Sequence, residues 1–114
     1  MTPEALEAAA LDLPGATLSI QWGDDRVYKV GGKMFAATDG TGTKLSFKAT
    51  DIAFEALTEA GRATPAAYMA RAKWVSFADA RELDAAEVAD WLRTAHALVA
   101  AKLTKAAKLG LGLA

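Results

Sequence analysis

The sequence predicts a single α+β domain with an antiparallel five-stranded sheet, whose helices pack on one face of the sheet. A chain of 114 residues with 53% hydrophobic and 24% charged residues has the size and composition of one globular domain. Between residues 17 and 48, apolar and polar residues alternate, and turn residues interrupt the alternation. After about residue 50 the apolar residues recur with the spacing of an amphipathic helix. Strands that cluster between helices indicate a sheet with one covered face and one face in water.

The first element is expected to be a helix over residues 3–11. Thr2 is a suitable N-cap, Pro3 fits the first helical position, and Glu4 places an acid in the first turn. An alanine-rich stretch continues the helix, which should stop before the Pro14-Gly15 pair.

Four strands are then expected, over residues 17–22, 26–30, 33–38 and 43–48. Gly31-Gly32 predicts a tight hairpin, because glycine reaches the positive φ angles that primed turns require. A second turn, over residues 39–42, precedes the fourth strand. In that strand Leu45 and Phe47 point one way, whereas Lys44, Ser46 and Lys48 point the other.

The second half of the chain predicts a helix over residues 51–60, a fifth strand over 73–77 and a last helix over 84–103. Gly61 is a plausible C-cap, and Asp84 with Glu87 has the spacing of a capping box. We expect the domain to cover residues 1–103, and residues 104–114 to form the helix end and a flexible tail.

The apolar faces of these elements predict the core. Its expected members are Leu18, Ile20, Leu45, Phe47, Phe54, Leu57, Trp91, Leu92 and Leu98.

Composition argues against several kinds of chemistry. Cysteine is absent and His96 is the single histidine, so a zinc site or a Ser-His-Asp system has little support. The turn over residues 39–44 lacks the glycine spacing of a phosphate-binding loop. We therefore expect a protein that is not an enzyme and uses no cofactor and no metal. No run approaches the about 18 apolar residues of a membrane span, and the first residues do not form a signal peptide, so we expect a cytoplasmic protein without membrane contact.

Five short segments occur in a characteristic order, at Leu13–Ala16, Val27–Ala36, Leu45–Lys48, Pro65–Tyr68 and Lys73–Val75, and a final helix follows them. This ordered set resembles the MmcQ/YjbR family. The resemblance covers roughly residues 3–103. It implies a fold like that of the frataxin and CyaY proteins, and it implies DNA binding. Iron binding, which in frataxin-like proteins depends on dense acidic residues, is not expected here, because alanines interrupt the few carboxylates of the first helix and strand.

The candidate binding surface is the open face of the predicted sheet. Lysines that neutralise phosphates and an aromatic ring that stacks on bases would suit DNA. The net charge of −1 and the pI of about 5.8 favour instead an acidic or partly apolar protein partner on the same face. A lysine-rich strand face that only remains in solvent is a third interpretation. Convergence of the basic residues on one surface would separate these interpretations. The candidate residues are Lys29, Lys33, Lys44, Lys48, Arg71, Lys73 and Trp74.

A second candidate is the loop over residues 63–71, which leads into the fifth strand. Tyr68 and Met69 in this loop either shape a groove or close the sheet edge as a packed connector, and we favour the connector.

Overall fold

The computed structural model describes residues 1–67, 69 and 72–113, and it confirms the α+β class with an antiparallel sheet. The elements follow the chain as α1 (Pro3–Leu11), β1 (Ala16–Gln21), β2 (Asp25–Val30), β3 (Lys33–Thr38), β4 (Leu45–Lys48), α2 (Asp51–Glu59), β5 (Thr64–Pro65), β6 (Trp74–Phe77), α3 (Ala85–Ala100) and α4 (Lys105–Gly110). A 3-10 turn at Ala80–Glu82 precedes α3.

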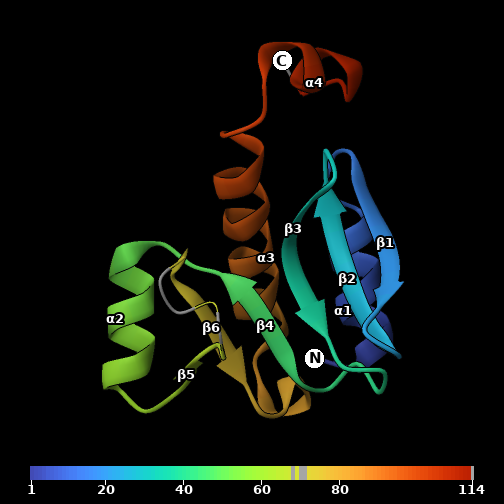
Figure 1. Ribbon diagram of the computed structural model, residues 1–114. Coiled ribbons are helices and arrows are strands. Elements are labelled where there is room, and N and C mark those ends of the chain that lie inside the picture. The colour runs from blue at the N-terminus through green and yellow to red at the C-terminus, as the bar shows by residue number, and fades with distance from the viewer. Residues whose placement is uncertain (68, 70–71, 114) are drawn as a thin grey trace.

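The sheet has six strands in the order β1-β2-β3-β4-β6-β5, one more than predicted. The additional strand, β5, is only two residues long and contains Pro65, so it carries no alternation that the sequence could reveal. In Figure 1, α1 and α3 lie behind the strands β1 to β4, and α2 lies beside β5 and β6. The other face of β1 to β4 carries no helix (Figure 1).

Four helices begin at hydroxyl or carboxylate caps. The side chains of Thr2, Thr50 and Asp84 each accept a hydrogen bond from the backbone N–H three residues later, which satisfies a donor that the helix leaves free. Thr104 does the same for α4, a helix within the segment expected to be a flexible tail. Leu111 and Leu113, which follow α4, pack against the core and give this short helix an anchor.

The core lies between the sheet and the helices. Of the predicted core residues, Leu45, Phe47, Leu57 and Leu92 are buried. Leu18, Phe54 and Trp91 are partly buried against the core, and Leu98 is half-buried. Ile20 was predicted wrongly: it is 53% exposed. It lies near the end of the edge strand β1, where its neighbours are the small turn at Gly40 and Thr41 and not a helix.

Phe47, Phe77 and Trp91 form a stack that joins the sheet to α3. Their ring centroids are 5.0–6.0 Å apart, with interplanar angles of 14–20°. Such pairs add to the free energy gained by burial alone.

An irregularity in β3 turns two consecutive side chains toward the helices. The register between β2 and β3 shifts after Tyr28, so that Tyr28 faces Ala36 and Lys29 faces Met34. Phe35, the extra residue, is fully buried together with Ala36. Its ring meets the edge of His96 at 5.4 Å, and His96 Nε2 lies 2.7 Å from the Pro14 carbonyl. The single histidine is thus a packed residue with a satisfied ring nitrogen.

Candidate functional site

A groove runs across the open face of the sheet. Its floor is a row of small side chains on three neighbouring strands, because Ala37 pairs with Ser46 and Ser46 pairs with Ser76. The two serine hydroxyls are hydrogen-bonded at 3.2 Å. The groove has a volume of about 300 Å³. The same three strands carry Ala36, Phe47 and Val75 on the opposite face, so the hollow follows from the contrast in side-chain size.

Trp22 forms one end of the groove. Its side chain is 67% exposed, and its backbone has φ +49°, a left-handed conformation that is unusual for a bulky residue. Gly23 follows with φ +88°, and Trp22, Gly23 and Asp24 form the loop between the paired residues Gln21 and Asp25 of β1 and β2. A tryptophan here carries backbone strain and exposes an aromatic ring, two features that concentrate at functional sites.

The opposite side of the groove is lined by Ala66, Ala67 and Met69. The Ala66 N–H donates to the Trp74 carbonyl at 3.0 Å, and the Trp74 N–H donates to the Met69 carbonyl at 3.2 Å. At Ala66 and Met69 the loop is therefore the packed connector that we favoured. The same two residues also line the groove. Tyr68, the other loop residue singled out from the sequence, lies outside the described residues.

Trp74 does not offer an exposed ring. Only 3% of this residue is accessible, although it was predicted to lie on a solvent-facing surface. Trp74, Val27 and Ala66 are buried without belonging to the main core, and they form the apolar underlayer of the open face. The exposed tryptophan of this face is Trp22, which sequence reasoning missed. Its signal was present as a bulky aromatic next to glycine in a turn between two strands.

The candidate basic residues that the structure describes lie at more than one place. Lys44 is exposed and lines the groove, and Lys29 lies on the same face between Thr17 and Met34. Lys73 is turned to the helix side, where its Nζ lies 5.0 Å from the centre of the Phe54 ring on α2. This direction agrees with strand alternation, because Lys73 precedes the core residue Val75 by two positions, whereas Trp74 faces the other way.

Lys33 and Lys48 lie together in a neighbouring hollow, which shares Met34 with the groove and reaches the C-terminal end of α3 at Lys102 and Leu103. The Lys48 ammonium donates a hydrogen bond to the Ala72 carbonyl. Partial burial, followed by repulsion from Lys102, lowers the pKa of Lys48. Arg71 lies outside the described residues.

Among the residues that the structure describes, the charges that line the groove do not favour an anion. Asp25 and Asp39 line the groove together with Lys44, so these described residues carry a net negative charge. Desolvation opposes ionisation of Asp39, but hydrogen bonds from Thr41 and from the backbone N–H groups of Thr43 and Lys44 outweigh it and lower the pKa of Asp39. Asp39 is therefore a carboxylate at neutral pH.

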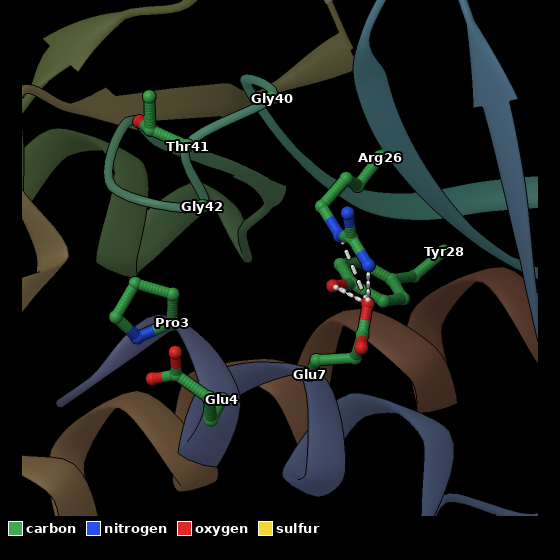
Figure 2. A pocket seen from close by; sticks show the side chains of 8 residues that line it. All are labelled: Pro3, Glu4, Glu7, Arg26, Tyr28, Gly40, Thr41 and Gly42. Atoms are coloured by element: carbon green, nitrogen blue, oxygen red, sulfur yellow. Dashed lines mark hydrogen bonds and ion pairs between the residues drawn. The ribbon is translucent and has the colours of Figure 1, made fainter.

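A second cavity, of about 230 Å³, lies between the start of α1 and the turn before β4 (Figure 2). Figure 2 shows Glu7 reaching from α1 to Arg26 and Tyr28. Arg26 Nη2 and Nε donate to Glu7 Oε1 at 2.6 and 2.9 Å, and the Tyr28 hydroxyl donates to the same oxygen at 3.3 Å. Burial, and then the Glu7 charge, raises the pKa of Tyr28 to about 12. The network ties α1 to the sheet through Glu7 Oε1.

The part of the chain that the structure describes was searched for groups of metal ligands and for membrane-spanning helices. None of its His, Asp and Glu side chains gather in threes in a way that could hold a metal ion. None of its helices has the length and apolar character needed to cross a membrane.

Comparison with known proteins identifies relatives of the fold. The model of the YjbR family matches residues 11–98. The crystal structure of the Deinococcus radiodurans protein DR2400, described by the domain name DUF419, is similar with a TM-score of 0.85 and 28% sequence identity. The match covers 99% of this chain and 89% of that protein. A search of curated proteins found no match.

Proposed function

We propose that this chain, which belongs to the YjbR family, is a non-catalytic binding module that captures a partly apolar segment of a protein partner in the groove of its open sheet face. The observation that carries the proposal is Trp22, an exposed tryptophan held in a strained turn at the end of that groove. Tryptophan is enriched among the residues that dominate binding energy at protein interfaces.

The groove has the composition of a surface for apolar anchors. Met34 and Met69 line it with Trp22, and methionine side chains adapt their shape to a bound residue. Ser46 and Ser76 offer hydroxyls on the floor. A volume of about 300 Å³ accommodates one or two partner side chains, with the backbone of the segment lying across the strands.

DNA is the weaker candidate for this face. Within the described part of the chain, the candidate basic residues are divided among the groove, the α2 side and the end of α3, and the described charges of the groove are two carboxylates and one lysine. Affinity for nucleic acid depends mainly on neutralising phosphates, which needs several cations on one surface. The buried Trp74 also leaves no accessible ring for base stacking at that position.

The test begins with selection of peptides from a random-sequence library on the immobilised protein. Peptide affinity is then measured by calorimetry for the parent and for Trp22→Ala. We expect at least a tenfold loss, about 1.4 kcal/mol, because a central aromatic anchor is removed. Ala37→Met places a larger side chain on the groove floor and should lower the affinity for the same peptides.

Ile52→Ala is the matched control, since Ile52 is an apolar residue of α2 that is 84% exposed and lies outside the groove. It should bind the peptides like the parent. Equal affinity of the parent and both groove variants would contradict the proposal.

Salt-titrated binding of single- and double-stranded DNA is measured on the same samples. Salt-dependent DNA binding that Lys44→Glu weakens, without peptide binding in the groove, would replace the protein partner with DNA.

A further inference from the structure

The strand β1 leaves one edge of the sheet without a partner. It pairs with β2 through all six residues and is the first strand in the sheet order. Within the described part of the chain, the residues 17–22 make no backbone–backbone hydrogen bond outside this pairing. Figure 1 shows β1 on the outer side of the sheet with no segment running alongside it. Unpaired N–H and C=O groups along such an edge are a template for another strand.

The sequence of β1 lacks the features that normally prevent edge pairing. From Leu13 to Gly23 there is no charged residue, and no proline occurs between Ala16 and Gln21. The opposite edge contrasts with it, because β5 has two residues and one of them is Pro65. Of the two sheet edges formed by the described residues, the β1 edge has the length and chemistry for extension by a strand.

We propose that the β1 edge binds the β1 strand of a second copy of this chain, antiparallel and centred on Ser19. This assignment rests on the strand edge and is independent of the groove. In this register each Ile20 lies opposite Leu18 of the other copy, and Thr17 lies opposite Gln21. Ile20 is 53% exposed, and Leu18 is the half-buried apolar neighbour on the same face of the strand. The contact therefore covers an apolar residue that the single chain leaves in water.

A second copy fits better than an unrelated strand, because β1 is complementary to itself in this register. Apolar residues meet on one face and polar residues on the other, and no like charges approach. Two-fold pairing uses up the β1 edge of both copies, so the assembly closes at a dimer. One strand pair makes a small interface, and we therefore expect a reversible, concentration-dependent equilibrium.

Analytical ultracentrifugation of the full chain tests the assembly. We expect the parent to shift from monomer to dimer as its concentration rises, and Ile20→Lys to remain monomeric with an unchanged circular dichroism spectrum. Ile52→Lys is the matched control on α2 and should dimerise like the parent. A parent that stays monomeric at all concentrations overturns the proposal, as does a dimer that Ile20→Lys leaves intact.

Single-cysteine crosslinking tests the register, and the chain suits it because it has no cysteine of its own. Directly opposed residues of antiparallel strands have Cα atoms about 4.5–5.5 Å apart, within the range of a disulfide. Ser19→Cys should therefore form a covalent dimer on mild oxidation. In the same dimer the two copies of Thr17→Cys lie about 13 Å apart along the strands and should not crosslink. Crosslinking of Thr17→Cys but not of Ser19→Cys overturns the register.

Discussion

The same strands form both faces of this sheet, but the side chains on the helix face are large and those on the open face are small. The helix face carries large buried residues such as Phe47 and Val75, whereas the open face carries Ala37, Ser46 and Ser76 at neighbouring positions. On the helix face Phe47 and Val75 pack within the core. On the open face the small row leaves a hollow and a strained, exposed Trp22 beside it. We therefore expect stability to reside on one face and binding on the other.

The largest expected effect comes from a matched pair on β4. Phe47→Ala removes a ring that is 1% exposed and stacks on Phe77 and Trp91, and it should lower the free energy of unfolding by about 3–5 kcal/mol. Ser46→Ala, one residue earlier on the open face, removes one hydroxyl pair and should cost about 0.5–1.5 kcal/mol. Urea unfolding measures both. Similar losses for the two variants would mean that the faces do not differ in this way.

Because of Tyr28, the free energy of unfolding should decrease at alkaline pH. The folded protein raises the pKa of Tyr28 from its ordinary value of 10.0 to about 12, so the unfolded chain loses this proton first. The stabilising contribution is complete below pH 10 and is lost as pH rises from about 10 to about 12, by about 2–3 kcal/mol in all.

The measurement is the free energy of unfolding of the parent and of Tyr28→Phe across this pH range. The variant lacks the titrating hydroxyl, so the difference between the two proteins should shrink as pH rises. A constant difference would show that Tyr28 does not titrate in this range.

A smaller effect is expected at Asp39, in the turn at the rim of the groove. Asp39→Ala removes the acceptor of three hydrogen bonds and should cost about 1–2 kcal/mol at neutral pH. Asp39→Asn keeps an oxygen and should cost less. Since folding lowers the pKa of Asp39, the advantage of the parent over Asp39→Asn should fade as pH drops through the carboxyl range. Thermal unfolding between neutral and acidic pH measures this trend.

The smallest effect on stability should come from Trp22→Gly. Glycine adopts the left-handed φ at position 22 without strain, which offsets the greater entropy of the unfolded chain. We expect a change within about 1 kcal/mol, with stabilisation the favoured direction. The same variant should lose the peptide affinity of the groove. A loss of several kcal/mol in unfolding free energy would instead make Trp22 a structural residue.

Elements with a strong hydrophobic periodicity or clear capping residues were predicted correctly from the sequence. The helix that starts after Thr2 begins and ends where predicted, and Leu45 and Phe47 are buried as their alternation indicated. Ile20 follows the same alternation of apolar and polar residues but is exposed. The alternation does not show that the end of an edge strand extends beyond the helix that covers the rest of it.

The site was predicted less well, because it depends on how segments far apart in the sequence come together. Lys73 and Trp74 were assigned to one basic, aromatic surface, but neighbouring residues of a strand face opposite sides, and the Lys73 side chain lies against Phe54 of α2. The hydrogen bonds of Ala66 and Met69 to the Trp74 backbone bring a loop beside Trp74, which is buried. The groove floor joins Ala37, Ser46 and Ser76 from three strands, and strand pairing brings these small residues together in a way that no local pattern indicates.

The strand order has a consequence for how the molecule folds. The strands β1 to β4 lie side by side in the order of the chain, so their pairings close short loops and carry little entropic cost. The pairing of β4 with β6 must wait until α2 and the following loop have been placed, because these lie between the two strands in the chain. We therefore expect the meander to form early and β6 to join it late. The groove takes its floor from both parts, so binding competence should be among the last properties to appear during refolding.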